Sequence, residues 1–279
     1  MTIPKPRSVW SLAMTCTFAA AWHAAGAALG QAILVPISEP ERIAVLDPDT
    51  ADLITLIDIS DFTATPINVI DGPDGTLLLS DQVNDMVYQL DSTGALIGDY
   101  LTSRLDNIRG IHLLDCGVLG GATTNGLFGW DPTGVLLPNT IAGDFFDCLP
   151  KGKLFVGSDI DDDNVQAYDR NFVLVGQSPL GSVDFPEQIN IVTENRIAAA
   201  SFSDGAIYFF DFDTGIPVGS FPIRGNGGGR GVFQLSNGNF LVSDTLNGID
   251  EYDPSGIFIR NILDDPTARY IEFCENFSL

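Results

Sequence analysis

Residues 240–258, FLVSDTLNGIDEYDPSGIF, contain two short apolar runs, each ending in turn residues. The first run ends in Ser-Asp and the second is closed by Asp-Pro-Ser-Gly. Aspartate at the first position of a turn accepts backbone N–H bonds, proline presets φ at the second, and glycine adopts positive φ. The stretch is therefore typical of short antiparallel strands joined by tight turns, and the rest of the chain can be searched for further copies.

The aspartate that opens this last turn, Asp253, has five counterparts spaced 38 to 44 residues apart along the chain. These are Asp47, Asp91, Asp131, Asp169 and Asp211. A short apolar run precedes and follows each one, and a further hairpin comes earlier in the repeat, most plainly in INVIDGPDGTLLLSD (residues 67–81). A period near 40 residues with four strands per copy is typical of propeller blades.

Six such repeats predict an all-β fold, a six-bladed β-propeller with four-stranded antiparallel blades. The last repeat stops after one strand, RYIEFC (residues 269–274), and the first repeat lacks that strand. Strands from both termini would together complete one blade and leave no exposed sheet edge, which predicts a ring closed by both ends. The alternative is a chain truncated inside a further blade.

Two copies, GNFLVSDTLNGIDEYDPSGIFIRNI (residues 238–262) and GTLLLSDQVNDMVYQLDSTGALIGDYL (residues 75–101), resemble repeats of the NHL family of six-bladed propellers. The copy at residues 153–176 is a looser match, and those around Asp47 and Asp211 are degenerate. The resemblance implies the fold. It implies no single activity, since such propellers serve as binding platforms and sometimes as enzymes.

The first 30 residues have the features of a secretory signal peptide. Lys5 and Arg7 precede an uncharged apolar run over residues 8–28, and small residues follow in AAGAALGQA (residues 24–32). A single membrane anchor is the alternative, because the run approaches spanning length. The sequence predicts a cleaved peptide at residues 1–30, a single propeller domain at 31–279, a secreted or periplasmic location, and no membrane span in the mature chain.

The composition excludes several classes of function. With 13 Lys and Arg against 37 Asp and Glu, the chain repels phosphate backbones, so nucleic acid is not an expected partner. Only His23 and His112 are present, and His23 lies in the predicted signal peptide. Multi-histidine metal catalysis is therefore excluded, and His112 is expected to pack between blades. No G-x-S-x-G elbow or phosphate-binding Walker loop occurs.

Cysteines and acidic clusters suggest two further features. Export to an oxidising compartment favours disulfides, and we expect Cys116 and Cys148, each placed near the end of an inner strand in neighbouring repeats, to form an interblade bridge with Cys274 unpaired. The run SDIDDDN places Asp159, Asp161 and Asp163 in alternation, a spacing that suits Ca²⁺. The alternative is that Asp159 is a turn residue, like Asp81 and Asp244.

A pattern of arginines indicates an anion site. Counting back from the turn after each inner strand gives equivalent positions to Arg109, Asp144, Gln188, Arg230 and Arg269, with Thr65 or Pro66 in the remaining repeat. Inner strands line the axis, so these side chains are expected to ring one mouth of the channel, helped by the backbone of Gly227, Gly228 and Gly229. Alternatively, the arginines pair with Asp144 or Glu187 and only hold blades together.

These observations predict an exported, acidic binding module with no catalytic residues and no required cofactor. Its expected partner is a protein, peptide, glycan or small anionic ligand. The other hypothesis is a calcium-dependent lactone or ester hydrolase, because enzymes of that kind share the propeller form and use oxygen ligands at the channel mouth.

Overall fold

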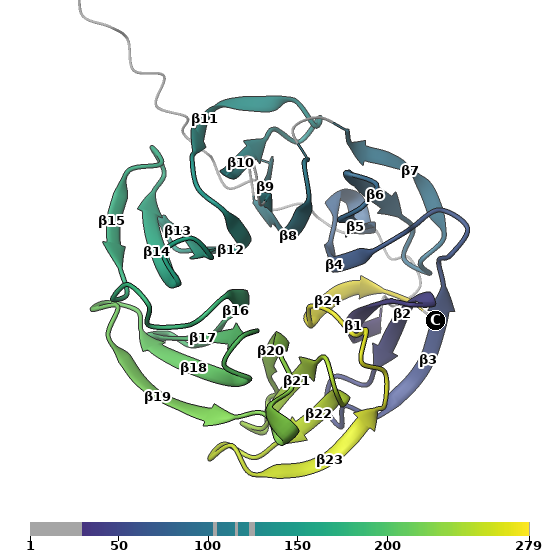
Figure 1. The fold of residues 1–279 in the computed structure, drawn as a ribbon. Coiled ribbons are helices and arrows are strands. Elements are labelled where there is room, and N and C mark those ends of the chain that lie inside the picture. The colour runs from purple at the N-terminus through teal and green to yellow at the C-terminus, as the bar shows by residue number, and fades with distance from the viewer. Residues whose placement is uncertain (1–29, 103–104, 115–116, 123–125, 279) are drawn as a thin grey trace, which may run out of the picture.

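The computed structural model describes residues 30–278 apart from 103–104, 115–116 and 123–125. Six four-stranded antiparallel sheets stand around a central axis, as the sequence predicts (Figure 1). The predicted signal peptide lies outside the described residues, apart from Gly30. Among those that are described, no helix has the length and apolar character needed to cross a membrane.

The four strands of each blade run from the axis outward in a constant order. The innermost strands are β4 (Pro66–Asp71), β8 (Ile108–Leu114), β12 (Phe145–Lys151), β16 (Pro186–Thr193), β20 (Gly229–Gln234) and β24 (Glu272–Phe277). The second strands are β5 (Leu77–Asp81), β9 (Gly117–Ala122), β13 (Leu154–Asp159), β17 (Arg196–Ser201), β21 (Phe240–Asp244) and β1 (Gly30–Ser38).

The third and fourth strands complete the blades toward the outside. The third strands are β6 (Met86–Leu90), β10 (Gly126–Trp130), β14 (Asn164–Asp169), β18 (Ala206–Asp211), β22 (Gly248–Tyr252) and β2 (Glu41–Leu46). The outermost are β7 (Leu96–Leu101), β11 (Leu136–Ile141), β15 (Leu174–Gln177), β19 (Pro217–Pro222), β23 (Phe258–Leu263) and β3 (Leu53–Asp58). Two 3₁₀ turns, η1 (Pro73–Gly75) and η2 (Arg224–Asn226), lie between strands.

Both termini contribute to one blade, in the order β24-β1-β2-β3. Strand β24 pairs antiparallel with β1, with Cys274 opposite Ala32 and Glu272 opposite Leu34. Just before β24, Ala268 forms an isolated bridge with Ile37 of β1. The predicted closure by both ends is therefore confirmed.

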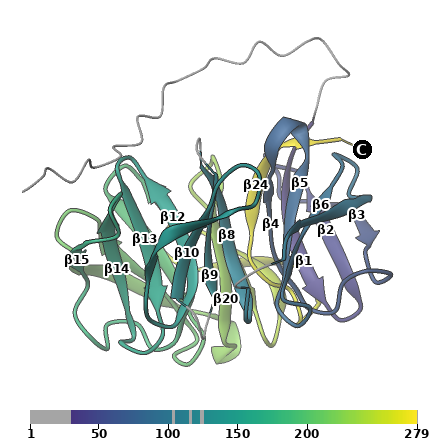
Figure 2. The ribbon, with the colours of Figure 1, turned by 90° about the horizontal axis from the view of Figure 1, so that it is seen from above.

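Apolar side chains between neighbouring blades form the core. One cluster joins the closing blade to the β4–β7 blade through residues such as Leu34, Val45, Val69 and Leu79, all of them fully buried. The blades stand side by side around the ring in the edge-on view of Figure 2. Because every inner strand runs in the same direction along the axis, the first residues of all six inner strands meet at one face.

The six repeat aspartates hold the turn between the third and fourth strand. Each accepts hydrogen bonds from backbone N–H groups two to four residues later, and for Asp253 the donors are Ser255 and Ile257, both at 2.9 Å. Hydrogen bonds lower the pKa of all six carboxyl groups: the largest contribution is a backbone N–H for Asp47, Asp169 and Asp253, and a threonine hydroxyl for Asp91, Asp131 and Asp211. The repeat seen in the sequence is thus a repeat of turn geometry.

The glycine of the strict D-x-x-G copies serves two purposes. Gly94, Gly134 and Gly256 have φ of 86°, 80° and 83°, which disfavours residues with a side chain. Each also lies against the outer strand of the preceding blade, and a Cβ on Gly256 would be 2.3 Å from Cβ of Phe221 in β19. The copy at Asp169 has Phe172 at a φ of 60° instead.

We predict that Gly256→Ala lowers the free energy of unfolding by about 1–3 kcal/mol more than Gly152→Ala does. Both glycines have positive φ, so both substitutions strain the backbone, but a Cβ on Gly152 would meet no atom within 4 Å. The difference between the two variants isolates the contact with Phe221. Urea denaturation measures it, and equal losses in the two variants would contradict the blade contact.

Candidate functional site

The backbone register defines which residues at the channel mouth are equivalent. In five blades the inner strand begins opposite the last residue of the second strand. In the closing blade the equivalent residue is Ala268, which precedes β24 and forms an isolated bridge with Ile37 of β1. These first residues are Pro66, Ile108, Phe145, Pro186, Gly229 and Ala268. The residues that follow them form what we call the mouth ring: Ile67, Arg109, Phe146, Glu187, Arg230 and Arg269.

The structure places the three arginines in the mouth ring and corrects two other positions. Phe146 stands where the sequence alignment has Asp144, and Glu187 stands where it has Gln188. Counting from the turn fails because turn lengths differ: five residues separate Asp71 from its partner Leu77, but only two separate Lys151 from Leu154. A register shift in β16 adds to the error.

Arg109 pairs with Glu187 across the blade that lies between them. Its Nη1 donates to Oε2 of Glu187 at 3.0 Å and to Oε1 at 3.2 Å. The Arg109 guanidinium also lies over the Phe146 ring, with its carbon atom 3.6 Å from the ring centre, which is a cation–π contact. Glu187 also accepts a hydrogen bond from the Tyr270 hydroxyl at 3.1 Å. The only carboxylate of the mouth ring is therefore fully engaged.

Arg230 has no hydrogen bond and no ion pair with any described residue. Its Nε and Nη1 atoms are buried and lack a partner. Burial lowers the pKa of Arg230, the Glu187 charge raises it, and the Arg109 charge lowers it, so the three groups are electrostatic neighbours. Arg269 donates from Nε to the Ser38 hydroxyl and has no acidic partner within the described part of the chain. The mouth ring thus holds three cations and one anion.

The glycine run beside Arg230 is packed rather than open. The N–H of Gly228 donates to Oγ1 of Thr245 at 2.9 Å, and Gly229 pairs with Asp244. A Cβ on Gly227 would be 2.3 Å from Oδ1 of Asp244. These glycines allow close approach of the β21–β22 turn, so the backbone N–H of Gly228 is not available for an anion, contrary to the sequence-based expectation.

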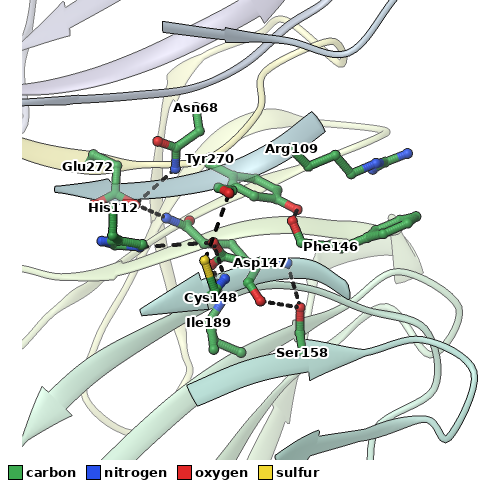
Figure 3. A network of polar contacts seen from close by, with 12 residues as sticks. Asn68, Arg109, His112, Phe146, Asp147, Cys148, Ser158, Ile189, Tyr270 and Glu272 are labelled. Carbon is green, nitrogen blue, oxygen red and sulfur yellow. Dashed lines mark hydrogen bonds and ion pairs between the residues drawn. The ribbon is translucent and has the colours of Figure 1, made fainter. Parts of the chain in front are cut away.

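A second layer of side chains fills the axis below the mouth ring. Tyr270, which is fully buried, reaches across the axis, and its hydroxyl shares its one proton between Oε2 of Glu187 and the carbonyl oxygen of Phe146 in the opposite blade, 3.3 Å away (Figure 3). Gln188 accepts hydrogen bonds from the backbone N–H groups of Val232 and Ile271, both at 3.0 Å. Gln188 is therefore a structural cross-link between three blades rather than part of the mouth ring.

Buried ionisable groups lie deeper along the axis (Figure 3). Oε1 of Glu272 accepts hydrogen bonds from Nδ2 of Asn68 at 3.2 Å and from Nε2 of Gln188 at 2.8 Å. Burial raises the pKa of Glu272 to about 7, against the effect of these two bonds. Asp147 accepts from the backbone N–H groups of Cys148 and Ile189, yet burial and then the Glu272 charge raise its pKa well above the usual range.

His112 lies beside these groups with its side chain 19% exposed, and it is part of no metal-ligand cluster among the described residues. Its Nε2 lies 4.0 Å from Oδ1 of Asp147 and has no hydrogen-bond partner among the described residues. Burial lowers the pKa of His112 to about 4, so the ring is neutral at pH 7. This agrees with the expectation that His112 packs between blades.

The three aspartates considered for calcium do not converge. Asp159 accepts backbone N–H bonds from Asp161 and Asp162, like the turn residues Asp81 and Asp244. Asp163 instead accepts the N–H of Phe185. Within the described ranges, no group of three or more His, Cys, Asp or Glu residues is arranged to hold a metal ion.

Of the predicted disulfide, Cys148 is among the described residues and Cys116 lies outside them. Cys148 is a buried, free thiol in the middle of β12, not near the end of its strand as we expected, and its Sγ lies 3.9 Å from the carbonyl oxygen of Gly110. Cys274 is likewise buried and free. The bridge between Cys116 and Cys148 stays a prediction.

Sequence reasoning named Glu187 only as a possible partner of the arginines, which its ion pair with Arg109 confirms, and it missed Tyr270 and Glu272. Glu187, Tyr270 and Glu272 lie in PEQINIV (residues 186–192) and RYIEFC (residues 269–274). Acidic residues inside otherwise apolar inner strands are uncommon, because a buried charge needs a partner. The sequence therefore shows that these acids are unusual, although it does not show which groups bind Glu272.

Comparisons with known proteins support the fold only. No family model matches the chain, and no curated protein matches it. Among solved structures, a protein of unknown function from Bacteroides caccae is 13% identical with a TM-score of 0.64, covering 88% of this chain and 98% of that one. A chain of the nidogen–laminin complex is 11% identical with a TM-score of 0.70, at the same coverage.

A third similar structure is virginiamycin B lyase from Staphylococcus aureus, 13% identical with a TM-score of 0.59. It covers 76% of this chain and 78% of its own. At such identities the likeness establishes the propeller and says nothing of ligands or chemistry.

We predict that Glu272→Gln removes the loss of stability that Glu272 causes as pH rises from about 4.5 to about 7. The pKa of Glu272 rises from 4.5 to about 7 on folding, so folding takes up a proton between these values and the free energy of unfolding falls as pH rises through them. A glutamine keeps the acceptor oxygen and adds a donor next to Oδ1 of Asn68, which has no partner.

Relative to the parent, the variant is expected to gain roughly 1–3 kcal/mol between pH 5 and pH 7.5, since one pKa unit corresponds to about 1.4 kcal/mol. Denaturation at several pH values measures this. The lowered pKa of His112 has the opposite effect on stability. Because of it, the free energy of unfolding falls as pH falls from 6.5 toward 4. A parent and variant with parallel pH profiles would show that Glu272 stays ionised in the folded protein.

Proposed function

We propose that the protein is a ligand-binding propeller that takes a small anionic group, a carboxylate or a phosphate, at the mouth ring. The observation that carries the proposal is the state of Arg230: its Nε and Nη1 atoms are buried, and no described residue pairs with them. A buried charged donor without a partner costs free energy, and a bound anion would remove that cost.

The electrostatics of the mouth ring favour an anion over a cation. Glu187 forms its ion pair with Arg109, and its single negative charge faces three arginines, so the mouth ring keeps an excess of positive charge. The structural reading, in which the arginines only join blades, fits Arg109 well. It does not fit Arg230, because Arg230 has two buried donor atoms without a partner and no ion pair among the described residues, whereas Arg109 has one such atom and an ion pair with Glu187.

The comparisons are compatible with this proposal and with others. One similar chain belongs to a complex of two proteins, nidogen and laminin, and another is named as a lyase, so the same architecture serves binding and catalysis. We keep the kinship with NHL propellers as part of the proposal, on the residues quoted above. The calcium-dependent hydrolase hypothesis gains no support, since the described aspartates form no ligand cluster.

Export is also part of the proposal, because the evidence for it is the sequence of residues 1–30. We predict that the mature protein begins near residue 31 and is recovered from the periplasm or the medium. Amino-terminal sequencing of protein purified from those fractions checks this. Recovery of the uncleaved chain with the membrane fraction would favour the anchor alternative.

We predict that Arg230→Met weakens binding of acetate or inorganic phosphate by roughly 10- to 100-fold, because a charge-assisted hydrogen bond contributes about 1.5–3 kcal/mol. The melting temperature is expected to stay the same or rise, since methionine fills similar space and removes an unpaired buried charge. Isothermal titration calorimetry and thermal unfolding give the two readouts.

Arg170→Met is the matched control for net charge. Arg170 is exposed in the turn after β14 and takes no part in the mouth ring. This variant is expected to bind anions like the parent. If the parent binds neither anion, or if Arg230→Met unfolds several degrees earlier, the arginines are structural and the proposed function is wrong.

A further inference from the structure

Three phenylalanine rings connect Arg109 to Arg230 along the mouth. The Phe146 ring, under the Arg109 guanidinium, meets Phe185 edge to face, with 5.1 Å between ring centres and an interplanar angle of 89°. Phe185 meets Phe202 at 5.6 Å. The Arg230 guanidinium lies 5.7 Å from the Phe202 ring. We call these three rings the aromatic wall.

One residue of the aromatic wall has a strained backbone conformation. Phe185, just before β16, has a φ of 52°, a left-handed conformation that is strained for a bulky residue. Two hydrogen bonds stabilise it: its N–H donates to Oδ1 of Asp163 at 3.0 Å, and its carbonyl oxygen accepts the N–H of Phe202 at 3.0 Å. Strained residues of this kind are common at binding sites.

The wall ends in an apolar surface beside the unpaired cation. Phe146 is only 2% exposed, Phe185 is half-buried, and Phe202 is 37% exposed. A ligand that reaches Arg230 therefore meets the Phe202 and Phe185 rings. A flat ring gains by packing on them, in offset or edge-to-face geometry.

We infer that the mouth ring takes aromatic carboxylates, with the carboxylate bound by Arg230 and the ligand ring packed on Phe202 and Phe185. This rests on the proposed function, because it assigns a ligand class to the same arginine. The surroundings of Arg230 favour a carboxylate carried on an apolar ring over free phosphate, because strongly hydrated phosphate loses more solvation when it leaves water for a partly apolar site.

The test compares four probes on the parent protein by isothermal titration calorimetry: benzoate, phenylacetate, acetate and inorganic phosphate. We expect benzoate or phenylacetate to bind at least about tenfold more tightly than acetate, through burial and stacking of the ring. In Phe202→Ala this advantage is expected to fall to about threefold or less, while acetate binds as it does to the parent.

Phe258→Ala is the matched control. Phe258 is 39% exposed on the outer strand β23 and also lies under an arginine, with the Arg224 guanidinium 4.6 Å from its ring centre. This variant removes an equally exposed phenylalanine below a guanidinium but leaves the mouth intact, so it is expected to keep the preference for aromatic acids.

The outcomes separate this inference from the proposal beneath it. Equal affinity for acetate and benzoate in the parent overturns the aromatic preference and leaves the anion site standing. A Phe202→Ala variant that loses acetate and benzoate alike, or that keeps the full preference, also overturns it. Failure of all four probes to bind the parent overturns both the inference and the proposed function.

Discussion

The pairing of β24 with β1 is the constraint on which the rest of the structure depends. It completes the four-stranded sheet of the blade shared by both termini and so closes the ring. The same short segment supplies Arg269 to the mouth ring, Tyr270 to the layer below and Glu272 to the buried axis. Closure and site construction are thus one event, because none of these side chains meets its partners until the C-terminal strand is in place.

The axis combines a polar interior with an apolar periphery. Leucine, isoleucine and valine pack between the blades, whereas Asp147, Gln188 and Glu272 occupy the centre and are bound mainly by backbone and amide groups. Buried polar groups of this kind contribute little net stability, but their directional bonds fix which strand lies next to which. In a ring of similar repeats that choice is otherwise weakly determined, since apolar faces of neighbouring blades resemble one another.

The sequence was sufficient to predict the fold because the turn residues that mark each repeat act locally. Asp253 and Gly256 mark a turn whose geometry depends on four residues, and the same geometry recurs at each repeat aspartate. The site was less predictable because its contacts are not local. Arg109 and Glu187 come from blades that are not neighbours, and no spacing rule relates them. Differences in turn length put Gln188 in the ring position that Glu187 occupies, so the sequence showed Glu187 as a possible arginine partner but not as a member of the mouth ring.

The side chain of Tyr270 also determines from which face the mouth ring can be reached. By reaching from one blade to the carbonyl group of the opposite blade, it divides the axis into two separate ends. A ligand of the proposed mouth site would therefore enter and leave at the same face. Its rates of binding and release would depend on the loops of that face, which can change in sequence without disturbing the axis behind them.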